Sequence, residues 1–250
     1  MGQDQITCEL LPLERRVSVD AVIAVVAAQR EPAILDTADV TPGRGRFTIL
    51  TCWPLRTRAW RAGDDDPFET MRAELRRIGP PRLDRNGCVD ASTLPFHGGW
   101  IGYFAYEAGG WLERLPATRI DDIHLPLARF GLYDSALIHD AVTHTWTAVA
   151  ADLRGVYPDA PPPAERLAFW RDLVDQTVEP RLPPGRLAVE PVENLSRAAY
   201  IDRVRRAKAY IAAGDIFQVN LARRLTLPAV EPAAHTYLRL RTANPSAYGA

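Results

Sequence analysis

Three strand-like segments in the middle of the chain most strongly constrain its fold. Residues 97–106, 128–139 and 145–151 are rich in apolar, aromatic and β-branched side chains, which favour strands. The last two segments are joined by the short sequence DAVTH, which predicts a β-hairpin. Helical segments flank these strands but do not alternate regularly with them. We therefore predict an α+β fold, built mostly from antiparallel sheets with helices to one side.

The helical segments carry clear start signals. Ser18 can cap a helix over residues 18–30, and Pro67 stands at the first position of a helix over residues 67–78. A third helix, AERLAFWRDLVDQ, interrupts a proline-rich stretch over residues 155–195 that is a candidate connector between two sections. The remaining predicted elements of the first section are short strands over residues 33–37 and 46–53.

The section after the connector has the sharpest pattern. Ser196 and Gly214 bracket a helix with apolar residues on one face and arginines on the other. Ile216–Leu227 then alternates in a way that predicts a strand. Polar side chains on one side of this run are either active-site groups or a face that meets solvent; they include Asp215, Gln218 and Asn220. Another predicted helix begins at Pro232 and ends before Asn244-Pro245.

Composition excludes several classes of protein. Hydrophobic residues make up 47% of the chain and the formal net charge is −1, so no overall charge favours nucleic acid or a membrane surface. No apolar run is long enough to span a bilayer. The first residues, MGQDQITCELLPLERR, lack the basic start and apolar core of a signal peptide. We therefore expect a cytoplasmic protein with no membrane or nucleic-acid partner.

Residues that bear reactive chemistry are scarce. Cysteines 8, 52 and 88 form no CxxC pair, and the five histidines do not stand at metal-ligand spacing from them. Three reduced thiols are the simplest interpretation, and no metal site is assigned. All but one of the 30 basic residues are arginine, so Lys208 is the only candidate for a lysine-dependent mechanism.

The segment HGGWIGYFAYEAGG contains Gly98, Gly99 and Gly102 between aromatic residues. A glycine-rich phosphate loop is one interpretation, but the spacing matches neither GxGxxG nor a P-loop. A strand that another backbone approaches closely is the interpretation we favour.

These motifs together resemble a known family. YIAAGDIFQVNLARR, followed about twenty residues later by NPSAYGA, resembles the start of the chorismate-binding domain shared by anthranilate synthase component I and aminodeoxychorismate synthase component I. GGWIGYFAYEAG resembles the glycine-rich strand of their N-terminal domain. The resemblance covers the chain from about residue 30 to its end. It implies an anthranilate synthase component I-like fold truncated in its second half, with residues 1–190 as the N-terminal section and residues 191–250 as the start of the chorismate-binding domain.

Asn220 and Ala222 in QVNLARR favour the aminodeoxychorismate type. The resemblance then implies that chorismate and ammonia from a glutamine amidotransferase subunit give 4-amino-4-deoxychorismate, toward 4-aminobenzoate and folate. The alternatives are a fragment of anthranilate synthase component I, which serves tryptophan synthesis, and a non-catalytic module that binds an amino acid or the glutaminase subunit.

The resemblance also implies a tryptophan-type pocket. Leu35-Asp36-Thr37 stands where the family has Leu-Glu-Ser, so the carboxylate is one methylene shorter. A carboxylate and a hydroxyl can bind an amino group, and loop amides can bind a carboxylate. A packed sheet edge without ligand is the alternative. The implied pocket residues are Asp36, Thr37, Arg44, Gly45, Arg46 and Phe47, with Pro245, Ser246 and Ala247 on the facing loop.

The catalytic apparatus that the resemblance implies does not occur in these residues. The family uses Mg²⁺ held by late glutamates, and the aminodeoxychorismate type adds a lysine nucleophile in a Pro-Ile-Lys-Gly-Thr segment. Lys208 stands instead in the helical sequence RRAKAYI. We therefore assign no catalytic residue and no metal ligand, and expect both beyond Ala250. The 250-residue chain alone is expected to be inactive in chorismate amination and partly exposed at its C-terminal section.

Overall fold

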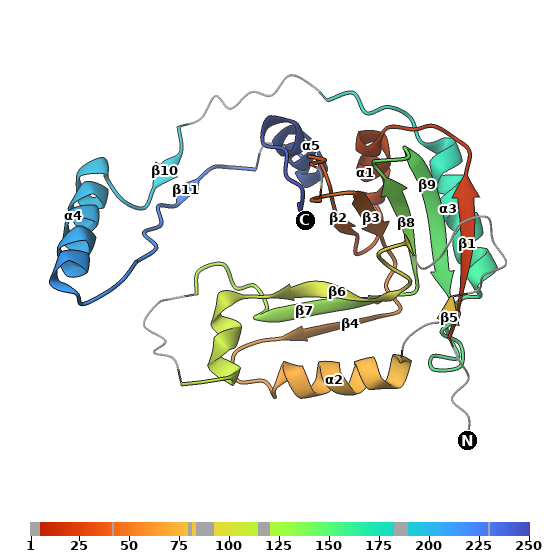
Figure 1. The fold of residues 1–250 in the computed structure, drawn as a ribbon, viewed down its shortest axis with the longest axis horizontal. Coiled ribbons are helices and arrows are strands. Elements are labelled where there is room, and N and C mark those ends of the chain that lie inside the picture. Colours follow the sequence, from red (N-terminus) through yellow and green to blue (C-terminus); the bar gives the residue numbers. More distant parts are fainter. Residues whose placement is uncertain are drawn as a thin grey trace. The chain divides into compact units, whose positions relative to one another are not determined.

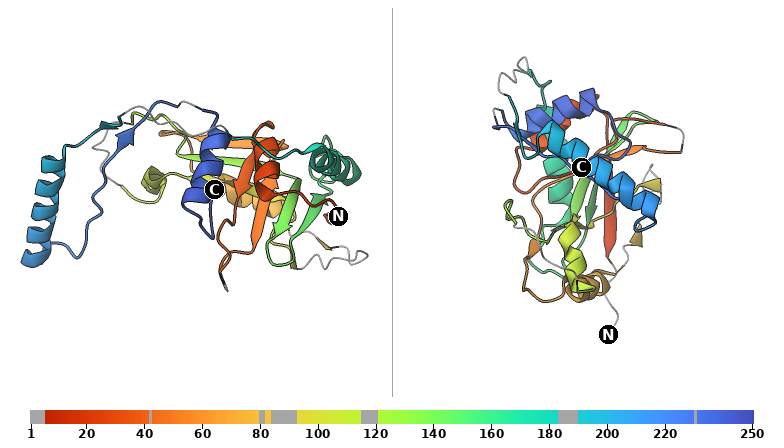
Figure 2. Two further views of the ribbon diagram at one scale, coloured as in Figure 1. Left: turned by 90° about the horizontal axis from the view of Figure 1, so that it is seen from above. Right: turned by 90° about the vertical axis from the view of Figure 1, so that its left-hand side faces the viewer.

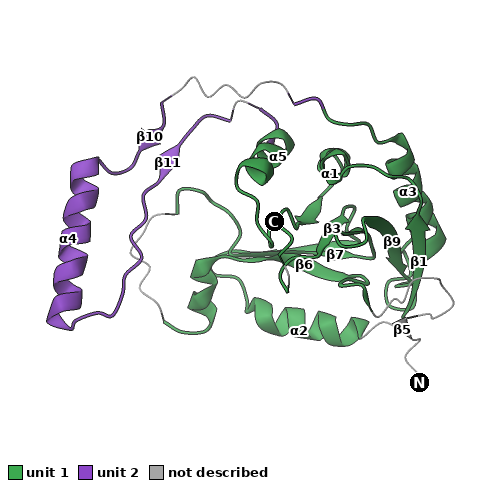
Figure 3. Cartoon of the chain, turned by 45° about the horizontal axis from the view of Figure 1, so that its top comes forward, with its two compact units in different colours: residues 1–180, 234–250 green, residues 181–233 purple. Residues whose placement is uncertain are grey.

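The computed structural model describes residues 6–41, 43–79, 82–83, 93–114, 121–182, 190–229 and 231–250. The chain forms two compact units, one of residues 1–180 with 234–250 and the other of residues 181–233 (Figure 3). The last residues of the chain thus fold with its N-terminal section. The division at residue 190 concerns the fold of the complete family protein and stays a prediction.

The first unit is built on a large sheet of six strands in the order β2-β3-β8-β9-β1-β5 (Figure 1). All neighbouring pairs are antiparallel except β1 and β5, which confirms the mostly antiparallel α+β prediction. Helix α3 packs against β9, β1 and β8. The strands are β1 (Thr7–Leu13), β2 (Ala33–Leu35), β3 (Phe47–Thr51), β5 (Arg82–Leu83), β8 (Ser135–Asp140) and β9 (Thr145–Ala151), and the helices that pack on this sheet include α1 (Val19–Val26) and α3 (Pro163–Gln176).

A small sheet of three antiparallel strands, in the order β4-β7-β6, completes the first unit. Helix α2 packs on it, because Met71 from α2 joins the cluster of Trp60 and Ala128 from the sheet. The elements of this part are β4 (Arg56–Trp60), α2 (Pro67–Ile78), β6 (Gly99–Phe104), the 3-10 helix Tyr106–Trp111 and β7 (Ala128–Tyr133).

Residues 128–140 contribute one strand to each of the two sheets of the first unit. The sequence predicts a single strand over residues 128–139, but β7 ends at Tyr133, β8 begins at Ser135, and the two strands belong to different sheets. Asp134, at the break, is buried with its side chain 1% exposed, and it pairs with Arg166 at 3.0 Å. The single-strand prediction is therefore wrong, because a buried ion pair marks a change of sheet that apolar alternation does not reveal.

The core of the large sheet is anchored by Trp170 of α3, which is fully buried. Its indole N–H donates to the hydroxyl of Ser135 at 3.1 Å. The burial of this aromatic ring gives α3 a large share of its packing energy, and the hydrogen bond satisfies the one polar atom of the ring. Helix α3 is thereby fixed against β8 just after the change of sheet.

The second unit contains the helix α4 (Arg197–Ala213) and the two-stranded sheet of β10 (Val192–Glu193) and β11 (Leu225–Thr226). The predicted caps of the helix are confirmed: Ser196 accepts from the amide of Ala199, and Gly214 is left-handed with φ 82°. The predicted strand over residues 216–227 is wrong, because only Leu225–Thr226 is paired. Phe217 is fully exposed. Among the described residues, this segment has no neighbouring strand along most of its length, so alternation alone does not make it a strand.

Gly102 on β6 confirms the prediction of close backbone approach. A Cβ atom at this position would lie 1.9 Å from the carbonyl oxygen of Arg129 on the neighbouring strand β7. The glycines of this segment thus serve packing within the small sheet, and none of them starts a helix that could bind phosphate.

We expect Gly102→Ala to lower the free energy of unfolding by about 1–3 kcal/mol, because the added methyl group forces β6 and β7 apart. Gly110→Ala is the matched control, since a Cβ atom at Gly110 meets nothing within 4 Å. Urea unfolding of both variants measures the difference. Equal stability of the two variants would contradict the close approach.

Candidate functional site

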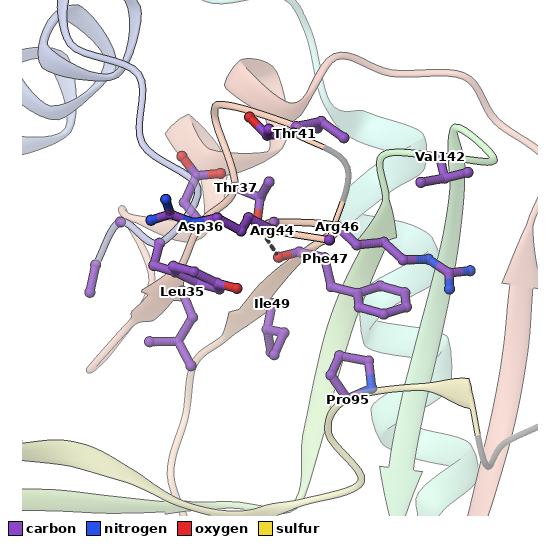
Figure 4. Close-up of a pocket in the computed structure, with 16 residues that line it drawn as sticks. Leu35, Asp36, Thr37, Thr41, Arg44, Arg46, Phe47, Ile49, Pro95 and Val142 are labelled. Atoms are coloured by element: carbon purple, nitrogen blue, oxygen red, sulfur yellow. Dashed lines mark hydrogen bonds between the residues drawn. The ribbon is translucent and has the colours of Figure 1, made fainter.

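A cavity of about 920 Å³ opens in the first unit beside β2 and β3. Its lining comes from β2, from the loop that leads into β3, and from the end of the chain after α5 (Ala233–Ala243). The lining residues are Leu35, Asp36, Thr37, Val40, Thr41, Gly43, Arg44, Gly45, Arg46, Phe47, Ile49, Pro95, Val142, Tyr248, Gly249 and Ala250 (Figure 4).

Six of the nine residues predicted for a pocket line this cavity: Asp36, Thr37, Arg44, Gly45, Arg46 and Phe47. Pro245, Ser246 and Ala247 do not line it. The carbonyl oxygen of Ser246 accepts from the amides of Ala38 and Asp39, and the Thr37 hydroxyl lies 3.1 Å from the carbonyl oxygen of Ala247. Two of the three facing-loop residues therefore hold the wall of the cavity in place.

The end of the chain adds an edge to the large sheet. The amide of Asp36 donates to the carbonyl oxygen of Gly249 at 2.8 Å, and the amide of Gly249 donates back at 2.9 Å. Gly45 packs against the same segment with φ +68°, and a Cβ atom there would lie 3.1 Å from the Cβ of Ala247 and 2.7 Å from the oxygen of Asp39. Only glycine fits this close approach without displacing the terminal segment.

Asp36 is the best-buried acidic group of the site. Its carboxylate accepts from the Thr48 hydroxyl at 2.9 Å, from the Tyr237 hydroxyl at 3.1 Å, and from Arg241 at 2.7 and 3.5 Å. Arg241 also binds Asp20 on α1 at 2.8 Å. Burial and the neighbouring carboxylate raise the pKa of Tyr237, so its hydroxyl stays protonated and donates. Figures 1 and 2 show α5, which carries Tyr237 and Arg241, beside α1 and β2.

The two arginines of the loop differ in their surroundings. Arg46 forms a bidentate pair with Asp140, at 2.6 to 3.1 Å, and its guanidinium lies 4.6 Å from the ring centre of Phe47. Arg44 exchanges backbone hydrogen bonds with Thr41 at 2.8 and 3.0 Å. In the part of the chain that the structure describes, no acidic side chain pairs with the guanidinium of Arg44.

The residues that sequence reasoning missed are Tyr237 and Arg241. They stand on one face of α5, and their partner Asp36 lies about 200 positions earlier, at separations of 201 and 205 residues. Their four-residue spacing places them on the same side of a helix. The spacing therefore indicates that the two side chains share a helix face, but it does not identify Asp36 as the carboxylate that they contact.

The described residues do not fit a Mg²⁺ site, because no group of three or more His, Cys, Asp and Glu side chains among them can hold a metal ion. Lys208 is exposed on α4, in the second unit. Cys8 and Cys52 are free and buried, and burial raises the pKa of each thiol to about 12, so both stay protonated at neutral pH. Cys88 lies outside the described residues.

Comparison with known proteins places the chain in a family. The model of the family described as "chorismate binding enzyme" matches residues 43–250. The chain belongs to the chorismate-binding enzyme family. This match covers the small sheet, four of the six strands of the large sheet and the second unit, so the predicted resemblance is confirmed.

Two curated members of the chorismate-binding family illustrate the relationship. Anthranilate synthase component 1 of Thermus thermophilus is 33% identical over 231 residues, which cover 88% of this chain and 48% of the relative. Aminodeoxychorismate synthase component 1 of Salmonella typhimurium is 30% identical over 231 residues, which cover 87% of this chain and 46% of the relative. The chain thus spans about half the length of these relatives, and the two names are supported equally.

A solved structure confirms the fold. The crystal structure of anthranilate synthase component I from Streptococcus pneumoniae superimposes with a TM-score of 0.61 at 20% identity, covering 94% of this chain and 53% of the other. The prediction of an anthranilate synthase component I-like fold is therefore confirmed. Within the described residues, no helix has the length and apolar character needed to cross a membrane.

Proposed function

We propose that this chain is the N-terminal part of an aminodeoxychorismate synthase component I, which converts chorismate and glutamine-derived ammonia to 4-amino-4-deoxychorismate. The observation that carries the proposal is the family match over residues 43–250. Asn220 and Ala222, in QVNLARR, favour this member over anthranilate synthase component I. The alternative is the anthranilate enzyme, whose product serves tryptophan synthesis.

In this proposal the described residues do not carry out the amination itself. They supply the large sheet, the cavity on it and the first helix of the chorismate-binding section. The ammonia comes from a glutamine amidotransferase subunit. No nucleophile and no Mg²⁺ ligand is assigned to the described residues, among which no group of three or more His, Cys, Asp and Glu side chains can hold a metal ion. The 250-residue chain alone is expected to have no amination activity.

The cavity beside β2 is proposed as a site for a small regulatory or structural ligand. Its volume of about 920 Å³ falls within the range of roughly 300–1,000 Å³ that is usual for small-molecule sites. It is formed by segments that stand far apart in the sequence, since Asp36 and Gly249, which pair with each other, both line it. A ligand in this position contacts both the N-terminal sheet and the segment after α5.

Genetic complementation tests the proposed reaction. The complete reading frame that contains this sequence is expressed, together with its amidotransferase partner, in one strain that requires 4-aminobenzoate and in another that requires tryptophan. We expect rescue of the first strain alone. Rescue of the tryptophan strain alone would establish the anthranilate alternative. Rescue of neither strain, with both proteins present in the soluble fraction, would overturn both.

A further inference from the structure

We propose that His139 makes the attachment of the C-terminal segment, residues 233–250, to the large sheet sensitive to pH. A proton on the His139 imidazole weakens this attachment. The inference requires no ligand in the cavity, and it does not depend on which product the complete protein makes from chorismate. It rests on a row of side chains that crosses the large sheet beside Asp36.

The side chain of His139 stands in a row on one face of the large sheet. Thr48 on β3 and Trp146 on β9 are its directly paired neighbours, on either side of β8 (Figure 1). Residues that face each other in an antiparallel pair project to the same side, with Cβ atoms about 5 Å apart. The ring centres of His139 and Trp146 are 4.7 Å apart, and the Thr48 hydroxyl donates to Asp36 at 2.9 Å. Thr48 therefore lies between the imidazole and the Asp36 carboxylate in this row.

Asp36 holds the C-terminal segment on the sheet. Tyr237 and Arg241 on α5 bind its carboxylate, and its backbone exchanges hydrogen bonds with Gly249. Arg241 is shared, since it also binds Asp20 on α1 at 2.8 Å. Two carboxylates thus depend on one guanidinium, so a change of charge beside Asp36 acts directly on the contact between α5 and the sheet.

A proton on His139 has no free acceptor nearby. The imidazole is half-buried, and within the part of the chain that the structure describes no oxygen accepts a hydrogen bond from it. Asp36 already receives four contacts, about as many as an ionised carboxylate can accept. Asp140 is bound by Arg46 in a bidentate pair. An imidazolium that takes an oxygen of either carboxylate therefore displaces an existing contact.

Opposing charges surround His139, and burial decides the direction of its pKa shift. Burial lowers the pKa of His139 most, and His144 in the hairpin turn, with its ring centre 6.5 Å away, lowers it further. Asp140 and Asp36 attract the proton, whereas Arg241 repels it. The other charged groups of the neighbouring elements stand in ion pairs: Asp20 with Arg241, and Arg46 with Asp140. His139 is therefore neutral at neutral pH.

The direction of the pH dependence follows from this shift. With the C-terminal segment attached, the pKa of His139 lies below its usual value. Detachment removes Arg241 and lets water reach the imidazole, so the pKa returns to about 6.5. The detached state then binds more protons, and the attachment weakens as the pH falls below about 6.5. Near pH 5.5 an imidazole in water is about tenfold more protonated than neutral, so detachment is favoured by at most about tenfold over neutral pH.

Hydrogen exchange followed by mass spectrometry tests this on the 250-residue chain, near pH 7.5 and near pH 5.5, with correction for the intrinsic exchange rates. We expect the protection of the Asp36 and Gly249 amides to fall severalfold at the lower pH, relative to the amides of β9, up to the limit of about tenfold. In His139→Gln this fall should disappear, because the substituted side chain does not titrate.

Two variants are the matched controls. His124→Gln removes an exposed histidine that lies outside the strands of the large sheet and pairs with Asp121, so it should respond to pH as the unchanged chain does. His144→Asn removes the neighbouring imidazole, and asparagine tolerates the left-handed backbone at this position, where φ is 56°. Because burial is the largest cause of the shift, this variant should keep most of the fall.

An NMR titration of the imidazole groups gives a second measurement on the unchanged chain. Through-bond assignment of His139 needs no variant, and its midpoint should lie below about 6.5. Equal protection at both pH values, an undiminished fall in His139→Gln, or a His139 midpoint at or above about 6.5 would each overturn the proposal. Complementation by the complete reading frame tests the amination reaction separately.

Discussion

Arg241→Met is expected to lower the free energy of unfolding by about 3–5 kcal/mol, the usual cost of removing one partner from a buried ion pair. The arginine side chain is 17% exposed and its partner Asp36 is 1% exposed. Methionine fills much of the same space, but among the described residues it leaves the Asp36 carboxylate with only the hydroxyl groups of Thr48 and Tyr237. The contact of α5 with Asp20 on α1 is lost as well.

The effect should be concentrated at the end of the chain, which Arg241 ties to the large sheet. Hydrogen exchange followed by mass spectrometry should show faster exchange at the paired amides of Asp36 and Gly249 than in β8 and β9. Arg129→Met is the control, because Arg129 pairs with Glu31 and both side chains are roughly half exposed. Surface pairs contribute about 0–1 kcal/mol. A cost for Arg241→Met no larger than that of the control would refute the assigned role.

A second large effect is expected for Arg166→Met, at the change of sheet between β7 and β8. Arg166 is the ion-pair partner of Asp134 and also donates to the carbonyl oxygen of Trp53 at 3.2 Å. Among the described residues, the other oxygen of the Asp134 carboxylate has no hydrogen-bond partner. Loss of the arginine therefore leaves a buried and almost unsatisfied charge, with an expected cost of about 3–5 kcal/mol near neutral pH.

The cost of Arg166→Met should depend on pH in a defined direction. Burial already raises the pKa of Asp134 above its usual value, although Arg166 lowers it. The substitution raises this pKa further, whereas in the unfolded chain it stays near ~3.9. Protonation of the folded state removes the uncompensated charge. The stability difference between the variant and the unchanged chain should thus be small near pH 4 and should grow as the pH rises through the raised pKa.

Denaturant unfolding of the two proteins at several pH values between 4 and 8 measures this dependence. Arg154→Met is the control, because Arg154 is 52% exposed and pairs with Asp152 near the surface, so we expect a cost below about 1 kcal/mol. A penalty for Arg166→Met that stays constant or shrinks as the pH rises would show that Asp134 is not the charge left behind.

Local signals in the sequence predicted most of the helices. Ser18, Pro67, Ser196 and Gly214 each mark a helix end that the structure confirms, because a cap depends on residues only three or four positions away. The hairpin of β8 and β9 was also predicted from a local signal, the short sequence that joins the two strands. The strands β1 and β4 were not predicted, since β1 carries Pro12 and β4 begins with three consecutive exposed polar residues. Their pairing partners decide their conformation.

The features that could not be predicted depend on contacts between residues that lie far apart in the sequence. The resemblance to the family implied pocket residues, and six of them line the cavity. It did not predict Arg241, whose contact with Asp36 joins positions 205 residues apart. No periodicity encodes such a contact. The strand predicted over residues 216–227 was wrong for the same reason, because alternation indicates a face and the presence of a neighbour decides whether a strand forms.

The single lysine of the chain offers a practical handle. Lys208 is exposed on α4, so an amine-reactive fluorophore has one side-chain target, apart from the α-amino group of the chain. The thiols of Cys8 and Cys52 are buried and will not compete for the label. The strong preference for arginine over lysine thus limits amine labelling of the unmutated chain to Lys208 and the α-amino group.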